Sequence, residues 1–412
     1  MSNPESLRCL LCKNARCSAA CPVRTDVPAA MRLYREGRTE EAARLLFDNN
    51  PLSAVTCQVC DWKRFCYGHC VLNAKGVPVK WYEVEQEISM AFLETARLDV
   101  PRSNGRSVAV IGAGPAGIAA SIFLRRKGFS VSLYDSHRQI GGVLRYGIPA
   151  FRLDKRYVDA YERLLSDAGV EFHGGVRVGK DLSLKSIRES HDAVLIAGGA
   201  EKARRMRIPG EDLPCVIPAL DYLERPGDYD LGRKVIVVGG GNVAMDACRT
   251  AVRTGAETWV YYRKTFENMP ANALEVSQAR EEGVQFAVFQ VPVSLSMRDG
   301  RGVAVVRDCE NVTGEDGRLA TRIIDGTDHE VVFDSMIIAV SESVDYSLLD
   351  GSDAQTDDHG WLLTDESQQT SLPGVFLAGD FLLGPKTVVQ AVQSAKLASD
   401  GIEEYLKSIT TV

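Results

Sequence analysis

Eight of the eleven cysteines of this 412-residue chain lie within its first seventy residues. They form two groups, the first with Cys9, Cys12, Cys17 and Cys21, directly followed by Pro22, and the second with Cys57, Cys60, Cys66 and Cys70. Thiolates at such short spacings can surround an iron–sulfur cluster, and a final Cys-Pro is typical of ferredoxin runs whose fourth cysteine binds the other cluster of a pair. The N-terminal part is therefore predicted to carry electrons and to depend on its metal for stability.

The setting of these cysteines favours metal over disulfides. Residues 1–6 lack the basic start and apolar run of a secretory signal, and no apolar stretch approaches the roughly 18 residues of a membrane span, so we expect a cytoplasmic protein without membrane contact. In a reducing compartment dense cysteines indicate metal or redox sites. Zinc is the alternative, because Cys-x-x-Cys pairs suit it as well. A net charge of −7 argues against a nucleic-acid partner.

The rest of the N-terminal part is predicted to be helical. Met31, Leu33 and the apolar run 45–47 recur at helical intervals between the cysteine groups, and Gly37 interrupts them. We expect a helical hairpin there, within an iron–sulfur domain of residues 1–100.

Beyond a linker at 101–105 the pattern changes to apolar strands alternating with helices. A strand at 107–111, a helix at 116–127 and a strand at 131–134 form one βαβ unit, and 234–238, 243–253 and 258–262 form a second. A strand at 336–340, the run 375–380 and a helix at 387–405 form a final segment that is expected to return the chain to the first nucleotide domain. The prediction is an α/β fold, with a helical two-[4Fe-4S] domain followed by two Rossmann-like domains, the second (231–342) inserted into the first (101–230 and 343–412).

The first glycine fingerprint predicts a dinucleotide site. Gly112, Gly114, Ala116 and Gly117 follow a strand and open a helix, where a pyrophosphate can lie on free N–H groups. Asp135 ends the second strand and can accept a hydrogen bond from a ribose hydroxyl. Gly379 and Asp380 follow a later strand, and Asp380 is a candidate for the ribityl or pyrophosphate part of a flavin, with a simple turn as the alternative.

The second fingerprint predicts another dinucleotide. It comprises Gly239, Gly241, Asn242, Val243 and Ala244, again between strand and helix. Arg263 and Lys264 follow the next strand, where a ribose 2′-phosphate needs positive charge, so NADP(H) is favoured and NAD(H) stays open. Asp246, inside the helix, is expected to be structural.

Two dinucleotides on one chain imply hydride transfer from nicotinamide to flavin. Hydride donors deliver electrons in pairs whereas iron–sulfur centres move them singly, and this chemistry belongs to the cofactors. No nucleophile motif or catalytic triad is evident, so we expect protein residues to position the cofactors rather than to react.

Together these motifs resemble the flavoprotein family that includes the small subunit of bacterial glutamate synthase and the N-terminal half of dihydropyrimidine dehydrogenase. The resemblance covers nearly the whole chain, and the Tyr-Gly-Ile-Pro-x-Phe-Arg-Leu stretch at 146–153 is its most specific motif. Length and the 386–389 segment look most like the electron-input subunit of bacterial dihydropyrimidine dehydrogenase.

The resemblance implies FAD, NAD(P)H and two [4Fe-4S] clusters. For one cluster it implies Cys9, Cys12, Cys17 and Cys70, and for the other Cys21, Cys60, Cys66 and Glu85, with Gln86 and Cys57 as alternatives for the last position. It also implies cofactor contacts at Gly142, Arg145, Arg152 and Thr387. Ser341-Glu342 and Asn272 depart from the family pattern, which leaves the nicotinamide contacts open.

The resulting hypothesis is an NAD(P)H-oxidising electron-input subunit that passes electrons through two clusters to a catalytic partner subunit, possibly in dihydropyrimidine dehydrogenase, within a hetero-oligomer. Glutamate synthase small subunit and a stand-alone NAD(P)H-dependent iron–sulfur flavoprotein are the alternatives, and a non-enzymatic redox sensor is a third. A disulfide reductase would need a redox Cys-x-x-Cys in the nucleotide region, where only Cys215, Cys248 and Cys309 occur.

Overall fold

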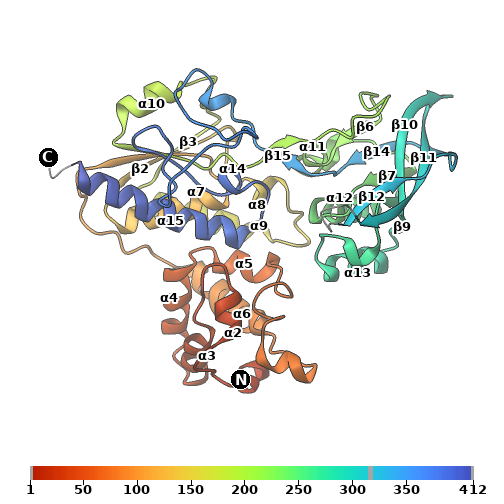
Figure 1. The fold of residues 1–412 in the computed structure, drawn as a ribbon. Coiled ribbons are helices and arrows are strands. Elements are labelled where there is room, and N and C mark those ends of the chain that lie inside the picture. The colour runs from red at the N-terminus through yellow and green to blue at the C-terminus, as the bar shows by residue number, and fades with distance from the viewer. Residues whose placement is uncertain (1–2, 314–318, 410–412) are drawn as a thin grey trace. The chain divides into compact units, whose positions relative to one another are not determined.

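A computed structural model describes residues 3–313 and 319–409 of the chain. Its contacts divide the chain into two compact units (Figure 1). The first unit comprises Met1–Arg145, Ala150–Ala200 and Val344–Val412, and the second unit comprises Tyr146–Pro149 and Glu201–Ser343. The chain therefore enters the second unit and returns to the first.

The N-terminal part of the first unit is helical, as predicted. Its elements are α1 (Pro4–Arg8), α2 (Arg16–Ala20), α3 (Val27–Arg35), α4 (Thr39–Asn49), α5 (Ser53–Val59), the 3₁₀ helix η1 (Val71–Lys75) and α6 (Trp81–Thr95). The predicted hairpin is confirmed in α3 and α4, which pack together across a turn where Gly37 has a φ of +74°. A core that includes Met31, Leu46 and Ile88 joins these helices.

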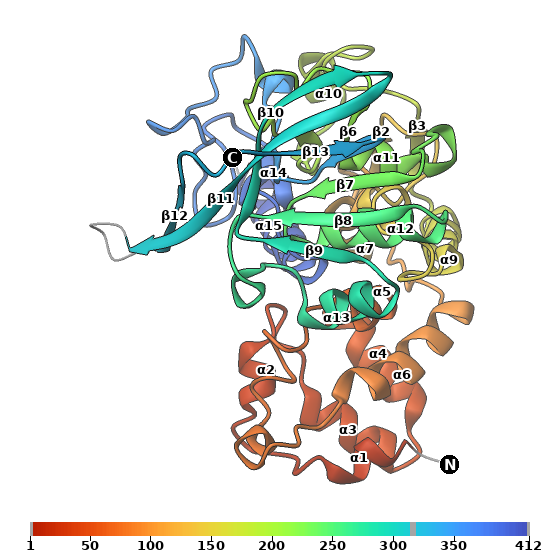
Figure 2. The ribbon, with the colours of Figure 1, turned by 90° about the vertical axis from the view of Figure 1, so that its right-hand side faces the viewer.

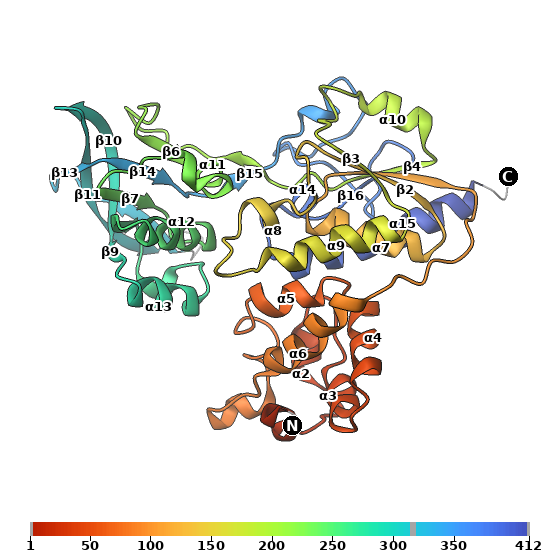
Figure 3. The same cartoon turned by 180° about the vertical axis from the view of Figure 1, so that it is seen from behind.

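The rest of the first unit is a parallel five-stranded sheet with strand order β16-β4-β1-β2-β3. The strands are β1 (Ser107–Ile111), β2 (Ser130–Asp135), β3 (Glu171–Gly174), β4 (Ala193–Ile196) and β16 (Val375–Leu377). The helices are α7 (Pro115–Arg126), α8 (Val143–Tyr146), α9 (Lys155–Asp167), α10 (Leu184–Ser190), α14 (Asp380–Leu383) and α15 (Val388–Ser408). Figure 3 shows α7, α9 and α15 along one face of the sheet and α10 on the other. Because β16 pairs with β4, the predicted return of the chain is confirmed for the segment that begins at β16. The strand expected at 336–340 in the same return is instead β14 (Ser335–Ile338), which pairs with β7 (Lys234–Val238) in the sheet of the second unit.

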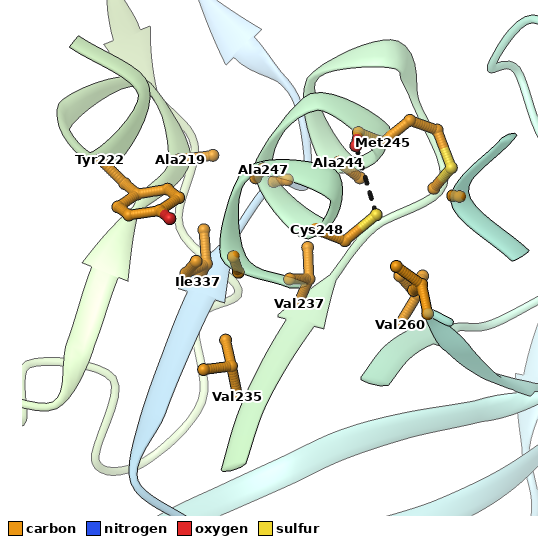
Figure 4. Close-up of a cluster of buried hydrophobic side chains, with 14 of the residues drawn as sticks. Ala219, Tyr222, Val235, Val237, Ala244, Met245, Ala247, Cys248, Val260 and Ile337 are labelled. Atoms are coloured by element: carbon orange, nitrogen blue, oxygen red, sulfur yellow. Dashed lines mark hydrogen bonds between the residues drawn. The ribbon is translucent and has the colours of Figure 1, made fainter. Parts of the chain in front are cut away.

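The second unit holds another parallel sheet, ordered β6-β14-β7-β8-β9. Its strands are β6 (Val216–Pro218), β7 (Lys234–Val238), β8 (Glu257–Tyr262), β9 (Gln285–Val288) and β14 (Ser335–Ile338), and its helices are α11 (Ala219–Glu224), α12 (Asn242–Arg253) and α13 (Ala273–Glu281). Helix α12 packs on the sheet through a buried cluster in which Ala247 and Cys248 lie near Val237, as Figure 4 shows.

An antiparallel sheet extends the second unit. It contains β10 (Gln290–Arg298), β11 (Arg301–Thr313), β12 (Leu319–Ile323) and β13 (His329–Phe333), with β10 and β11 forming a long hairpin (Figure 2). Two short strands, β5 (Lys202–Ala203) and β15 (Glu342–Ser343), pair where the chain enters and leaves this unit.

The predicted start of the second nucleotide domain at residue 231 differs from the structure, which places residues from Glu201 onward in the second unit. Strand β6 pairs with β14 there, and α11 packs on α12. Because β6 is only three residues long, it gives no periodic signal from which the sequence could assign it. Within the described ranges, no helix has both the length and the apolar character that crossing a membrane requires.

Candidate functional site

The first cysteine-lined cavity lies near the N-terminus of the first unit. Five cysteines line it, namely Cys9, Cys12, Cys17, Cys66 and Cys70, together with apolar side chains that include Leu10 and Trp81. Leu11 has a φ of +49°, in the left-handed region that bulky residues rarely adopt, and it turns the chain between Cys9 and Cys12. The four residues expected to hold one cluster therefore share one cavity.

The second cavity adjoins the first, and Cys66, Val27 and Trp81 line both. Its other potential ligands are Cys21, Cys60 and Glu85. Of the three alternatives for the last ligand, only Glu85 lines this cavity. Cys57 is fully buried with its thiol donating to the Ala54 carbonyl, and the Gln86 amide donates to the Cys57 carbonyl.

Glu85 is a buried carboxyl group without a neutralising cation. It is 8% exposed, and no hydrogen bond or ion pair to its side chain occurs within residues 3–313 and 319–409. Burial raises its pKa to about 8. A buried carboxylate is stable only when a cation or hydrogen-bond donors compensate its charge, so this residue suits a place beside a metal centre.

The thiols fall into the same two groups electrostatically. Burial raises the pKa of Cys17 to about 11, and the pKa of Cys9 is raised in the same way, with repulsion from Cys70 adding to both. Burial raises the pKa of Cys60 and of Cys66, and Glu85 and Cys21 add repulsion to each. Buried thiols crowded in this way become thiolates only when a metal supplies positive charge.

The donor set therefore fits iron–sulfur clusters. A [4Fe-4S] cluster takes one thiolate or carboxylate on each of four irons, so its ligands surround a volume rather than converge on one point. Among the described residues, no group of three or more His, Cys, Asp or Glu side chains is placed so that it could hold a metal ion.

The second cavity reaches the nucleotide-binding part of the first unit. Val389, in the first turn of α15, lines it beside the cysteines. The two parts are also joined by the Tyr161 hydroxyl, which donates to the Pro51 carbonyl at 2.7 Å, and by a 2.7 Å ion pair between Arg126 and Asp48. A cluster in this cavity would lie against the helix that ends the flavin-binding fold.

The first fingerprint forms a cradle at the start of α7. A Cβ atom on Gly112 would lie 2.3 Å from the Ala197 carbonyl oxygen, and one on Gly117 would lie 1.8 Å from the Gly112 oxygen. Gly114 is the N-cap of α7, and a Cβ on Gly142 would lie 2.7 Å from its Cα. These close approaches leave the N-terminus of α7 open to a pyrophosphate, which fits FAD.

Gly379 and Asp380 lie beside this cradle. A Cβ on Gly379 would lie 2.7 Å from that of Ala116, and the Asp380 carboxylate accepts from the Lys386 N–H at 3.1 Å. Thr387 is the N-cap of α15 and pairs with Gln390 in a capping box. These residues therefore gather between the starts of α7 and α15.

Asp135 and Arg145 have partners within the protein. The Asp135 carboxylate accepts from the backbone N–H of Ala113 and of His137, each at 2.7 Å, so it fixes the fingerprint turn. Arg145 donates to the Ile140 carbonyl and forms ion pairs with Asp159 and Glu162. The structure thus gives Arg145 a role in holding the Gly141–Gly142 loop. Arg152, the other arginine expected at a cofactor, is half-buried.

The second fingerprint forms a similar turn between β7 and α12. A Cβ on Gly239 would lie 2.2 Å from the Ala339 oxygen, whereas one on Gly241, the N-cap of α12, would meet nothing within 4 Å. The Asn242 side chain accepts from the Asn272 N–H at 2.9 Å, while Val243 and Ala244 begin the helix. A phosphate has space at this end of α12.

The predicted specificity residues lie at the end of the neighbouring strand. Arg263 and Lys264 follow β8, which pairs with β7, and Arg263 is exposed. Asn272 caps α13 and contacts the fingerprint through Asn242. Ser341 follows β14 with a φ of +104° and accepts from the Arg204 N–H, so this departure from the family pattern is a strained backbone position. Asp246 is buried inside α12, as expected of a structural residue.

Comparison with known proteins supports both halves of this picture. Residues 106–395 match the family described as pyridine nucleotide-disulphide oxidoreductase, and residues 1–96 match dihydropyrimidine dehydrogenase domain II, 4Fe-4S cluster. The small chain of NADPH glutamate synthase from Azospirillum brasilense is 36% identical over 99% of this chain and 89% of its own length. The chain belongs to the glutamate synthase small-chain family of flavoproteins. It is therefore an NAD(P)H-dependent oxidoreductase with FAD and 4Fe-4S domains.

Other relatives include a second glutamate synthase small chain and a subunit of a different enzyme. The glutamate synthase small chain of Escherichia coli K12 is 34% identical over 97% of this chain and 90% of the relative. The beta subunit of NADP(+)-dependent formate dehydrogenase from Moorella thermoacetica is 31% identical over 96% of this chain and 60% of the relative. Members of the family thus occur in enzymes with different substrates.

Solved structures confirm the fold. FprA from Mycobacterium tuberculosis in complex with NADPH superposes with a TM-score of 0.65 at 18% identity, over 74% of this chain and 86% of that one. Thioredoxin reductase from Lactococcus lactis gives 0.56 at 20% identity, over 74% and 99%. The predicted pair of Rossmann-like nucleotide-binding domains is confirmed.

Two features of the site were not predicted from the sequence. Val389 brings α15 to the second cavity, and Trp62 lines that cavity while its ring stacks on Tyr82 at 3.8 Å. Aromatic residues beside Cys60 and Cys66 were the only sequence signal for such packing.

Proposed function

We propose that this chain is an electron-input subunit that oxidises NADPH and delivers the electrons one at a time to a partner protein. When bound, FAD accepts a hydride and the clusters transfer single electrons. The observation that carries the proposal is the pair of adjoining cysteine-lined cavities, one of which reaches α15 of the flavin-binding fold. A dinucleotide oxidoreductase without onward electron transfer has no use for such cavities.

The proposed ligands follow the two cavities. Cys9, Cys12, Cys17 and Cys70 would hold one [4Fe-4S] cluster, and Cys21, Cys60, Cys66 and Glu85 the other. The cradle of Gly112, Gly114 and Gly117 would hold the FAD pyrophosphate, with Gly142, Gly379, Asp380 and Thr387 beside it.

NADPH is the proposed donor, because Arg263 and Lys264 stand at the end of β8 where a 2′-phosphate would lie. NADH remains the second substrate to test. Gly241 leaves the N-terminus of α12 open for the pyrophosphate.

The proposed partner is a separate catalytic subunit. Relatives of this chain include the small chain of glutamate synthase and the beta subunit of a formate dehydrogenase, so reduction of the final substrate would take place on a partner polypeptide. A pyrimidine-reducing subunit is the first candidate, because residues 1–96 match a dihydropyrimidine dehydrogenase domain. A glutamate synthase large chain is the second, because of the identity to small chains over nearly the full length.

Anaerobic half-reactions test this function. NADPH should bleach the flavin in the wild type and in Cys60→Ser, but electron delivery to a protein acceptor should be lost in the variant. Cys215→Ser, which changes a cysteine of the second unit, should behave as the wild type. A flavin that neither NADPH nor NADH bleaches would contradict the proposal, and copurification with a pyrimidine reductase or an amidotransferase would decide between the two partners.

A further inference from the structure

Three large apolar side chains stand in solvent beside the first cavity. Leu7, Leu10 and Val77 are 70%, 62% and 59% exposed, the highest values among the large hydrophobic residues of the described chain. Single exposed apolar residues are ordinary, but several together mark an interaction site.

Hydrogen bonds hold the two segments of this patch together. The Arg8 guanidinium donates to the carbonyls of Val77, at 2.6 Å, and Pro78, and it forms an ion pair with Glu5. Glu5 in turn accepts from the Lys80 N–H at 2.7 Å. The segment that carries Leu7 and Leu10 is therefore fixed against the one that carries Val77.

The patch lies at the proposed electron exit. Leu10 is exposed and lines the first cavity, which contains Cys9 and Cys12. The second cavity is the one that reaches α15 of the flavin-binding fold, so the first is farther along the proposed electron path. Electron tunnelling weakens steeply with distance, and an acceptor seated on Leu10 would touch a residue that lines the first cavity.

The segments that carry the patch are rich in positive charge. Residues 5–24 and 57–83 contain eight Lys and Arg against three acids, Glu5, Asp61 and Glu83, although the whole chain carries −7. Lys13, Arg16 and Lys75 are exposed, and none of them forms a salt bridge in the described structure. An apolar centre with a charged rim is the anatomy of a transient protein interface, in which the rim steers the encounter.

We propose that Leu7, Leu10 and Val77, with the rim of Lys13, Arg16 and Lys75, form the docking surface for an electron-accepting protein that carries acidic side chains around its own redox centre. This inference rests on the proposed function. Each docking event transfers one electron, so one NADPH gives NADP⁺, a proton and two singly reduced acceptor molecules. Redox encounters of this kind need only a small interface.

Two protein acceptors of opposite charge test the surface with the complete, cluster-loaded chain. With NADPH as donor, reduction of the acidic iron protein rubredoxin should have a higher kcat/KM than reduction of the basic protein cytochrome c at low ionic strength. Salt should slow the first reaction, because it screens the attraction. The double variant Lys13→Glu/Lys75→Glu should lose about tenfold in kcat/KM for rubredoxin and reverse the salt dependence.

Matched controls separate this surface from the rest of the mechanism. Lys180→Glu/Lys185→Glu makes the same charge change at two exposed residues in and just before α10, outside the cysteine-rich segments, and should leave rubredoxin reduction unchanged. Leu7→Ser/Val77→Ser should raise the KM for rubredoxin several-fold and leave flavin bleaching by NADPH intact. Neither pair of residues lines a cavity.

The outcomes distinguish two failures. Absence of flavin bleaching in the wild type would overturn the proposed function itself. If the flavin is bleached normally but kcat/KM for rubredoxin changes neither with salt nor in Lys13→Glu/Lys75→Glu, the docking surface alone would be overturned. If the chain self-associates and Leu7→Ser/Val77→Ser abolishes this, the patch binds a second copy of the chain. If the chain binds phosphatidylserine vesicles and the same substitutions abolish this, the patch binds a lipid surface. Either result would also overturn the proposed docking surface.

Discussion

The buried carboxyl group of Glu85 should make the cluster-free protein less stable as the pH rises. Burial raises the pKa of this group from 4.5 to about 8. Between these values the unfolded chain has released the proton while the folded chain keeps it, so the free energy of unfolding falls with increasing pH. At about 1.4 kcal/mol per pH unit, the loss reaches about 5 kcal/mol near pH 8 and is absent below pH 4.5.

Denaturant unfolding of cluster-free protein measures this effect. Glu85→Gln removes the titration, so its stability relative to the wild type should rise by about 3 kcal/mol between pH 5.5 and pH 8. Glu83→Gln is the matched control, because Glu83 lies in the same helix but is only half-buried and forms an ion pair with Lys80. Its stability should follow that of the wild type across the pH range.

Cluster loading offers a second readout if the cluster-free N-terminal part does not unfold cooperatively. Metal binding displaces protons from ligands, so reconstitution near pH 6.5 should release one proton fewer from Glu85→Gln than from the wild type. A stability difference between Glu85→Gln and the wild type that stays constant with pH, together with equal proton release, would refute the assignment of Glu85 as an uncompensated buried acid.

Three further results are expected. Anaerobically isolated protein should contain about eight iron and eight acid-labile sulfide per chain, and stoichiometric zinc in their place would contradict the two clusters. Arg263→Ala/Lys264→Ala should raise the KM for NADPH about 10- to 100-fold in steady-state kinetics, since hydrogen bonds to charged groups contribute about 1.5–3 kcal/mol. The KM for NADH should change little, and equal effects on both KM values would contradict a 2′-phosphate site. Gly112→Ala should reduce FAD retention on gel filtration, because its φ of +103° and the 2.3 Å approach to the Ala197 oxygen exclude a Cβ, and full retention would refute the cradle.

The sequence predicted what local patterns determine. Glycines at fixed spacing after an apolar strand predict a tight turn from that strand into a helix. Both such units, β1–α7 and β7–α12, occur where they were expected. The helical hairpin followed from apolar spacing and from Gly37. Spacing also predicted that the cysteines within each run lie close together, whereas the mixing of the two runs in each cavity was implied only by the family resemblance.

Tertiary packing determined what the sequence left open. Three residues competed as the last cluster ligand, and only the fold shows that Glu85 lines the second cavity while Gln86 and Cys57 bond elsewhere. The ion pairs of Arg145 with Asp159 and Glu162 could not be predicted, because they depend on α9, which lies beyond a turn that no short pattern specifies. Strand β6 was missed because its pairing partner, β14, is more than a hundred residues away.

The shared walls of the two cavities constrain how the protein matures. Cysteines from both N-terminal segments line the first cavity, and the second combines Cys21 with Cys60, Cys66 and Glu85. The proposed clusters would each take ligands from both segments. The first could be completed only after Cys70 has been synthesised, and the second only after Glu85.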